Sequence, residues 1–499
     1  MKLLQSLKII IVFLALVTPG LIFVIAGPVT GFEQKEQTDF PPYGLVLAPS
    51  PEYREQFADA IFERSAAKRW SVQFMNALHL YGFGFIDTNK AISGSDRWLF
   101  YKPQFEAWDC SRHAILKKKL DRFSLLLDLV TASEIPLVFA HAPNKASIER
   151  DRLGGRTTRY LDCYFRFEQQ FADAVSGMSP RHFVDHSRVL SHAPGEKPTY
   201  LKFDTHWTRE YGVHAMNQVF ESRPGVLGIP LQEYNTKNAP AITGTLSKIL
   251  LLKHEELIPV PVPVDPDPEA IRSAGLASNV LFIHDSFYGR ILPYLVRRSP
   301  NARFLHSGSD IGVQARESLD TADIVVVEMV QRHFLESIWS RSRLGWGGTF
   351  AEWMLEEMAA STQRCNWEDA RDLFSALPDT RVSMRNVETT GKKLRMTGSV
   401  KSRVLFQVPN DLAAGRVCLS VQLEVAGSGK TNLYFSVPGG TEQQAGYSDA
   451  LMVSKNLKSG ENTLALVLPE AFRGKWVRLD PIDHEGEFTI HALNIAPYN

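Results

Sequence analysis

The sequence has no excess of charge of either sign. Its 499 residues contain 55 Lys and Arg against 55 Asp and Glu, so the formal net charge is zero. Proteins that bind nucleic acid usually concentrate positive charge on one face, and we therefore exclude nucleic acid as a partner. A hydrophobic content of 44% with 22% charged residues is typical of a globular protein. The length predicts two or three domains.

Cysteine is also scarce, and no C-x-x-C or Cys/His spacing indicates a zinc site. The four cysteines are Cys110, Cys163, Cys365 and Cys418. Their even number allows disulfides in an oxidising compartment, with three possible connectivities, and buried free thiols are an equal alternative. We expect no metal and no cofactor.

Long apolar runs are absent except near the N-terminus. Residues 9–27 form an uncharged run, preceded by Lys2 and Lys8. Its 19 residues approach the roughly 20 that cross a bilayer and exceed the roughly 7 to 15 of a signal-peptide core. We therefore expect residues 1–30 to hold a membrane anchor, with a cleavable signal peptide ending near Val24-Ile25-Ala26 as the alternative. Either interpretation predicts that the remaining chain is exported.

Short apolar strands alternate with helical patterns over residues 31–364, the expected catalytic domain. Helices are predicted over residues 54–80, 111–133, 158–175 and 209–220, and strands over residues 135–140, 181–185, 279–283, 302–305 and 323–327. Such alternation is typical of an α/β fold, with a parallel sheet covered on both faces. Lys145, Ser286 and Glu328 each follow a predicted strand, so we expect them at one edge of the sheet.

Two other regions differ in texture. The proline-rich insert over residues 225–275 predicts a surface excursion without helix or central strand. Beyond residue 377, short alternating runs separated by turn residues predict a β-sandwich over residues 379–499, after a linker at residues 365–378. Sandwiches appended to exported enzymes often bind carbohydrate, although a fold alone does not establish this.

The candidate catalytic residues come from two distant loops. Asp204 and His206 lie two residues apart, so the carboxylate can fix the imidazole tautomer while the other ring nitrogen faces a substrate. Ser286 lies where a predicted strand gives way to a helix, a position that exposes a nucleophile. We predict Ser286 as nucleophile, His206 as general base and Asp204 as its orienting partner.

Two other classes of function compete with this interpretation. Asp204, His206, His284 and Asp285 are also ligand types for a divalent metal, which would make the protein a metal-dependent hydrolase. A non-catalytic glycan-binding protein is the third possibility.

Several motifs together resemble the AlgX/AlgJ family of polysaccharide O-acetyltransferases, over about residues 85–345. They are Asp204-Thr205-His206-Trp207, His284-Asp285-Ser286-Phe287, Pro143-Asn144-Lys145, residues 94–101 and residues 328–332. The resemblance implies an SGNH-hydrolase-like domain in which Asp204, His206 and Ser286 are catalytic, followed by a carbohydrate-binding sandwich. One departure is that the serine lies in H-D-S-F and not in the G-D-S-L of typical SGNH hydrolases.

The resemblance implies an exported bacterial enzyme that acetylates an exopolysaccharide such as alginate. Its location would be the periplasm, anchored in the inner membrane. Its partners would be the polysaccharide, a membrane protein that donates acetyl groups and the exopolysaccharide secretion machinery. An acetylesterase with the same triad is the alternative, because the sequence does not decide whether water or a sugar receives the acetyl group.

The remaining site predictions concern substrate binding. We expect the Ser286 N–H to be the first oxyanion donor and Asn144 the second. The side chains expected to bind the glycan are Asn144, Lys145, Tyr288, Arg290 and Arg332.

Overall fold

The computed structural model describes most of the chain. The residues described are 25, 38–40, 50–190, 198–231, 234–238, 242–252, 254–256, 259–263, 269, 275–307, 313–339, 349–373, 382–385, 388–390, 393–395, 402–412, 415–435, 452–483 and 487–499. Among these residues no helix is long and apolar enough to cross a membrane. The predicted anchor over residues 9–27 lies outside them, apart from residue 25.

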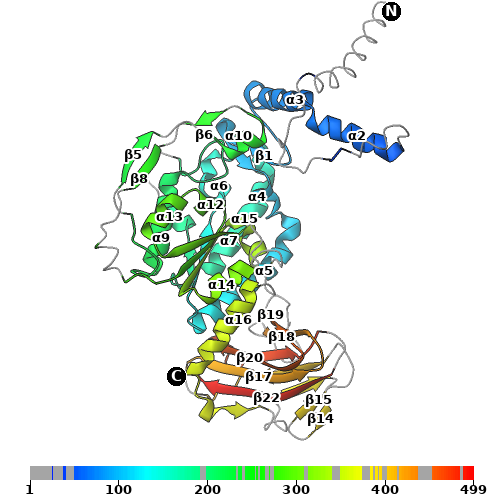
Figure 1. Cartoon of the computed structure of the whole chain (residues 1–499), viewed down its shortest axis with the longest axis vertical. Helices are drawn as coiled ribbons and strands as arrows, with labels where there is room; N and C mark the ends of the chain where they lie inside the picture. The colour runs from blue at the N-terminus through cyan, green and yellow to red at the C-terminus, as the bar shows by residue number, and fades with distance from the viewer. Residues whose placement is uncertain are drawn as a thin grey trace, which may run out of the picture.

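A parallel sheet forms the centre of the larger domain (Figure 1). Its strand order is β10-β9-β11-β3-β4, and every neighbouring pair is parallel. The strands are β3 (Leu137–Ala142), β4 (Phe183–Asp185), β9 (Val280–His284), β10 (Ala302–His306) and β11 (Ile324–Val330). The α/β fold predicted from the alternating pattern is confirmed.

Helices cover both faces of this sheet because successive strand residues point to opposite sides. Leu137 and Phe139 of β3 belong to one apolar core, whereas Val138 and Ala140 belong to the other. The first core packs against α5 (His113–Ala132), α7 (Leu161–Val175), α15 (Gln331–Trp339) and α16 (Thr349–Ser361). The second packs against α9 (Arg209–Ser222), α12 (Ser286–Gly289) and α13 (Leu292–Arg298).

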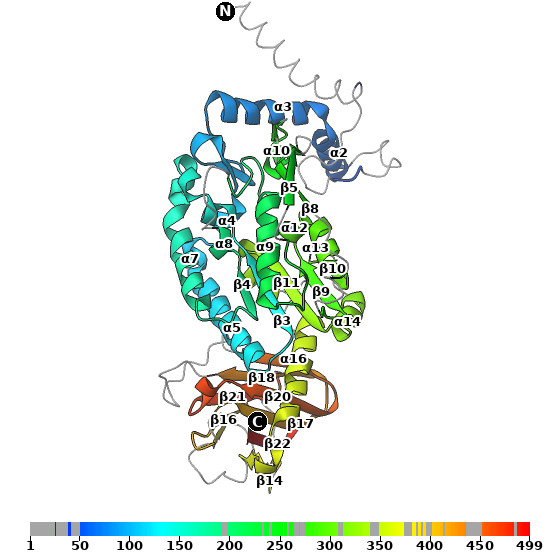
Figure 2. The ribbon, with the colours of Figure 1, turned by 90° about the vertical axis from the view of Figure 1, so that its left-hand side faces the viewer.

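The helical segment predicted over residues 54–80 is divided into three. It consists of α2 (Pro51–Arg64), α3 (Ala66–Ala77) and a π-helical turn, η2 (Leu78–Gly82). The break lies at Ser65, whose hydroxyl accepts a hydrogen bond from the Ala67 N–H at 3.2 Å and caps α3. Figure 2 shows α3 at the end of the molecule farthest from the sandwich.

The insert at residues 225–275 is not only a surface excursion, and this prediction needs correction. It contains a short helix, α10 (Thr245–Ile249), and two antiparallel ribbons, β5 (Tyr234–Asn238) with β8 (Pro259–Pro263) and β6 (Ile242–Thr243) with β7 (Glu255–Glu256). Leu246 and Leu250 are buried in a core cluster with Phe203. The insert therefore packs directly on the loop that carries Asp204 and His206.

The C-terminal region consists of two antiparallel sheets, as expected for a β-sandwich. One has the order β14-β15-β22-β17-β20 and the other β13-β16-β21-β18-β19. Their strands are β13 (Val382–Arg385), β14 (Glu388–Thr390), β15 (Lys393–Arg395), β16 (Arg403–Gln407), β17 (Val417–Val425), β18 (Gly429–Phe435), β19 (Met452–Leu457), β20 (Gly460–Leu468), β21 (Trp476–Asp480) and β22 (Phe488–Pro497). The β-sandwich predicted beyond residue 377 from short alternating runs is confirmed.

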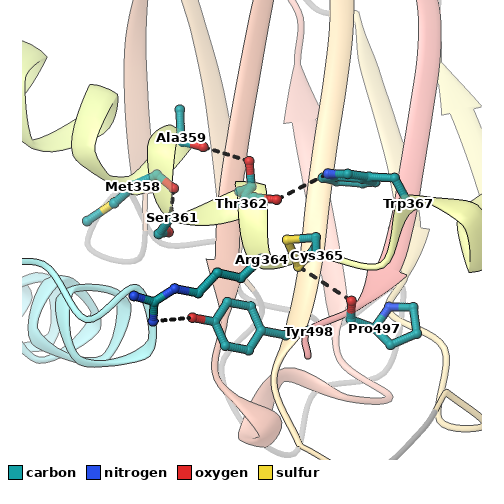
Figure 3. Close-up of a disulfide and its surroundings, with 10 residues drawn as sticks. Met358, Ala359, Ser361, Thr362, Arg364, Cys365, Trp367, Pro497 and Tyr498 are labelled. Carbon is teal, nitrogen blue, oxygen red and sulfur yellow. Dashed lines mark hydrogen bonds between the residues drawn. A yellow bond between two sulfur atoms is a disulfide. The ribbon is translucent and has the colours of Figure 1, made fainter.

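Two disulfides decide among the three connectivities, Cys110–Cys163 and Cys365–Cys418. The second joins the end of the α16 segment to β17 of the sandwich, and Figure 3 shows its surroundings. The region predicted as a linker is partly built into the sandwich, because β12 (Arg371–Asp372) pairs with β22.

An ion-pair cluster joins the two domains close to this disulfide. Glu134, which lies just before β3, accepts hydrogen bonds from Arg364 at 2.5 Å and from Arg416 at 2.8 Å. The sandwich therefore lies at the amino ends of the parallel strands, at the opposite end of the molecule from α10 (Figure 1).

Candidate active site

The structure brings the three predicted catalytic side chains together. Nδ1 of His206 lies 2.7 Å from Oδ1 of Asp204, and Nε2 of the same ring lies 2.9 Å from Oγ of Ser286. Asp204 and His206 lie in the loop that precedes α9, which begins at Arg209 with Thr208 as its N-cap. This geometry lets the imidazole receive a proton from the serine while the carboxylate stabilises the charged ring.

Asp204 is fully buried, and every contact of its carboxylate favours the ionised form. Oδ1 accepts hydrogen bonds from the backbone N–H groups of Thr205 and His206, at 2.6 and 3.1 Å. Oδ2 accepts from the Thr245 N–H at 3.0 Å and from Nη2 of Arg290 at 2.5 Å. Burial raises the pKa of this carboxyl, but the hydrogen bond and charge of His206 and the charge of Arg290 outweigh it and hold the pKa well below its usual range.

Ser286 is the exposed member of the set. It is the first residue of α12, directly after β9, and the preceding Asp285 fixes this turn. Oδ1 of Asp285 accepts a hydrogen bond from the Phe287 N–H, and Oδ2 accepts one from the Val330 N–H, both at 2.8 Å. Asp285 therefore ties the nucleophile turn to the end of β11. A substrate can reach the serine hydroxyl, whereas His206 is only 7% exposed.

Lys145 supports the catalytic loop from beneath and does not face solvent. Its Nζ lies within hydrogen-bond distance of four backbone carbonyls, those of Leu99 (2.7 Å), Leu201 (2.6 Å), Lys202 (2.9 Å) and Asp204 (3.2 Å). The residue is 2% exposed, and burial lowers the pKa of its ammonium group to about 7. The sequence-based prediction that Lys145 binds glycan is wrong for this conformation, because a buried amine caged by carbonyls cannot contact a ligand outside.

Asn144 lies beside Lys145 at the end of β3 and is fully buried. Its backbone N–H donates to the side-chain oxygen of Gln331 at 2.8 Å, and its own Oδ1 accepts from Nη1 of Arg332 at 3.2 Å. These contacts fix the side-chain amide, and none of the described residues accepts a hydrogen bond from its Nδ2. Nδ2 is itself buried, so the oxyanion role of Asn144 stays a prediction.

The other predicted glycan contacts have different positions. Tyr288 is fully buried, and its hydroxyl lies 2.9 Å from Nε2 of His186, so that prediction is wrong. Arg290 is partly exposed but is engaged with Asp204. Arg332 is partly buried, and its guanidinium lies over the rings of Tyr101 and Phe287. It is the predicted contact that combines positive charge with a place beside the nucleophile turn.

Glu328 was predicted to follow the end of a strand, but β11 continues beyond it to Val330. It lies within β11, fully buried, and Oε2 accepts a hydrogen bond from the Asp285 N–H at 3.2 Å. Burial, reinforced by the neighbouring charge of Asp285, raises its pKa well above the ordinary value. Glu328 is therefore a buried support beneath the nucleophile turn, through its hydrogen bond from the Asp285 N–H.

The side chains of the metal alternative are not gathered as a ligand set. Nδ1 of His284 bonds the carbonyl of Asp285 at 2.8 Å, and both carboxylate oxygens of Asp285 are occupied by backbone N–H groups. Within the described part of the chain, no group of three His, Cys, Asp or Glu side chains could hold a metal ion.

Sequence reasoning missed the supports of Asp204 for a physical reason. Thr245 acts through its backbone N–H, which carries no side-chain signal. The carbonyl cage of Lys145 is also made of backbone atoms, from residues that are distant in sequence.

Part of the chain matches a known protein family. Residues 91–282 match the family model described as SGNH hydrolase-like domain, acetyltransferase AlgX. This part of the chain carries an AlgX-type SGNH hydrolase-like domain. The match includes Asp204 and His206 and ends four residues before Ser286. No curated protein matches the chain by sequence.

Three solved structures are among those that match the chain. The O-acetyltransferase domain of Pseudomonas putida AlgJ is 20% identical with a TM-score of 0.35, covering 49% of this chain and 92% of its own. Pseudomonas aeruginosa AlgX is 12% identical with a TM-score of 0.36, covering 81% and 94%. Bacillus cereus PatB1 with a sulfonyl adduct is 13% identical with a TM-score of 0.36, covering 50% and 96%.

Proposed function

We propose that this protein is an exported O-acetyltransferase that acetylates hydroxyl groups of a bacterial exopolysaccharide, similar to alginate, through an acetyl-Ser286 intermediate. The observation that carries the proposal is the pair of hydrogen bonds that link the side chains of Asp204, His206 and Ser286. The AlgX-type family match over residues 91–282 supports acetyl transfer as the chemistry.

The reaction has two halves. In the first, Nε2 of His206 takes the proton of Ser286 as Oγ attacks the acetyl carbonyl of the donor, and the protonated ring then returns this proton to the leaving group. In the second, Nε2 of His206 takes the proton of a sugar hydroxyl as its oxygen attacks the carbonyl of acetyl-Ser286. The bond from the carbonyl carbon to Oγ of Ser286 then breaks, His206 gives the proton to Oγ, and the acetylated glycan and the free serine are released. Asp204 remains ionised throughout and stabilises the imidazolium.

Two donors serve the oxyanion in this proposal, the Ser286 N–H and Nδ2 of Asn144. Asn144 lies just after β3, and Ser286 lies just after β9. A single strand, β11, separates β3 from β9 in the sheet, and this supports the role of Asn144. Arg332 supplies the positive charge beside the acceptor site, which suits an acidic polysaccharide.

Export and partners belong to the same proposal. The apolar run over residues 9–27 supports a membrane anchor or signal peptide, and the two disulfides support an oxidising compartment such as the periplasm. A membrane acetyl donor and the exopolysaccharide secretion machinery are the partners that such a location provides. Carbohydrate binding by the sandwich is part of the proposal as well.

The test is to incubate the full chain with a soluble acetyl ester and an acidic polysaccharide such as alginate, and to measure free acetate and glycan-bound acetyl groups. We expect acetyl groups on the glycan and an acetylated Ser286 by mass spectrometry. Ser286→Ala should reduce turnover by on the order of 10⁶. Ser278→Ala, in an exposed serine just before the same strand, is the matched control.

Each outcome selects one function. Free acetate without glycan acetylation would favour the esterase alternative. Turnover that survives Ser286→Ala and is abolished by a chelator would favour the metal-dependent alternative. A folded protein that binds glycan but neither hydrolyses nor transfers acetyl groups would be a glycan-binding protein.

A further inference from the structure

An aromatic face near the N-terminal end of the described chain has no role in the proposed chemistry. Trp70, Phe74, Leu78 and Tyr81 recur at a spacing of three or four residues, so they share one side of α3 and η2. Their exposed fractions are 55%, 66%, 36% and 41%. Phe83 follows at 61%. We call this set the α3 aromatic face. A cluster of large apolar side chains exposed in this way indicates an interaction surface.

The opposite side of α3 is bound to the catalytic domain. Nδ2 of Asn76 donates to the Leu250 carbonyl at 3.0 Å. Leu80 of η2 is buried in the same cluster as Phe203 and Leu246. These contacts hold the helix in place with its aromatic face outward. The helix rests on the insert that supports the catalytic loop.

The charge of the segment suits an anionic surface. From Ser65 to Ile86 the chain contains Lys68 and Arg69 and no aspartate or glutamate. Tryptophan and tyrosine concentrate at membrane interfaces, where an apolar ring meets water, and basic residues beside such rings are attracted to anionic lipid headgroups.

The sequence upstream favours a lipid surface over another occupant. The apolar run over residues 9–27, predicted to cross or approach the membrane, ends fewer than 40 residues before α3 begins. If the run is retained as an anchor, it tethers α3 to the bilayer.

We infer that the α3 aromatic face lies on the membrane surface, with its aromatic side chains among anionic lipid headgroups. This orientation places the α10 end of the catalytic domain next to the bilayer and directs the sandwich away from it (Figure 2). An acetyl donor embedded in the membrane then meets the catalytic end directly. This last consequence rests on the proposed function, whereas the lipid contact does not.

A local fluorescent probe tests the contact in the full chain, independently of the N-terminal run. Both disulfides use all four cysteines, so Ser71→Cys supplies a single free thiol next to the face without removing any of its side chains. We label it with an environment-sensitive fluorophore and reconstitute the protein in vesicles of phosphatidylethanolamine and phosphatidylglycerol. A lipid-borne quencher should cause a clear loss of emission, because an interfacial helix buries its apolar face at the headgroup boundary.

Matched variants separate the face from general hydrophobicity. In the labelled protein, Trp70→Gln with Phe74→Gln should abolish quenching, whereas Ile115→Gln, at a residue on α5 that is 55% exposed like Trp70, should not change it. A probe at Lys458→Cys in the sandwich should remain unquenched. Because no substituted side chain belongs to the catalytic set, every variant should retain the activity of the unmodified protein on a soluble acetyl ester.

Three results would overturn the inference. The first is a Ser71 probe that lipid does not quench. The second is quenching that appears only when a second membrane protein is added, which would make that protein the occupant. The third is protection of the probe by self-association in solution, measured by sedimentation. If the unsubstituted protein does not turn over the soluble ester, this result would count against the proposed function and would not affect the lipid contact.

Discussion

Arg290 donates a hydrogen bond from Nη2 to Oδ2 of Asp204 at 2.5 Å, on the carboxylate oxygen that does not hold His206. The same nitrogen lies 3.3 Å from Nδ1 of His206. Arg290 therefore fixes the rotation of the carboxylate and, through it, the plane of the imidazole ring. It acts as a positioning residue, and the sequence had suggested a glycan contact at this place.

Replacing Arg290 by Gln should lower kcat on a small acetyl ester by about 10²-fold with little change in KM, because a misplaced base slows chemistry without weakening binding. Arg290→Lys should restore part of the loss. Arg303→Gln, on an exposed residue of β10, is the control. A variant with normal ester kinetics but a raised KM for glycan would show that Arg290 serves substrate binding instead.

Loss of the Asn144 amide should reduce oxyanion stabilisation. Asn144→Asp keeps the size and the oxygen that accepts from Arg332, but replaces the Nδ2 donor by an acceptor. We expect kcat to fall by about 10² to 10³. Thermal unfolding of the same samples checks that the protein is folded, and an unchanged kcat in a folded variant would remove Asn144 from the oxyanion site.

Lys145→Met should destabilise the catalytic loop, because four carbonyls lose their shared donor inside the protein. An unsatisfied buried polar group costs roughly 1 to 3 kcal/mol, and the effect should appear both in the free energy of unfolding from urea titration and in kcat. The control is Lys117→Met, which removes an exposed ion pair with Asp121 worth about 0 to 1 kcal/mol. Equal stability of the two variants would contradict the supporting role of Lys145.

His186 predicts an acid-sensitive core. Its ring is buried between Gln218 and Tyr288, and burial lowers its pKa to about 4. The unfolded chain, with a pKa near 6.5, binds the proton more readily, so stability is full above about pH 6.5 and falls as the pH drops towards 4, by about 3 kcal/mol for a buried group.

His186→Gln removes this titration, so its free energy of unfolding should vary less with pH than that of the unsubstituted protein. Urea unfolding at several values between pH 4 and pH 7 measures the difference. Parallel pH profiles for the two proteins would show that His186 is not the titrating group.

The parts of the fold predicted from the sequence are those that local pattern determines. The strands that became β9, β10 and β11 were predicted because short apolar runs between turn residues mark them directly. The D-T-H and D-S-F motifs pointed to His206 and Ser286 as a pair. The mistaken assignments of Tyr288 and Lys145 have one cause. Position after a strand does not reveal which way a side chain turns, and both residues turn inward, Tyr288 to His186 and Lys145 to backbone carbonyls.

The insert was misjudged for a related reason. None of the described strands of the insert belongs to the parallel sheet. Its prolines gave no indication that Leu246 and Leu250 pack on Phe203. Long-range packing of this kind depends on the tertiary structure and has no local pattern.

The attachment of the sandwich at the amino ends of the strands sets a minimum length for any ligand that touches both domains. β11 has 7 residues, so at about 3.3 Å per residue the sheet alone separates its two edges by about 23 Å. A single sugar can therefore contact either the catalytic end of the sheet or the sandwich, but not both at once. Under the proposed function, only an extended polymer could be held by the sandwich while successive sugar units reach Ser286.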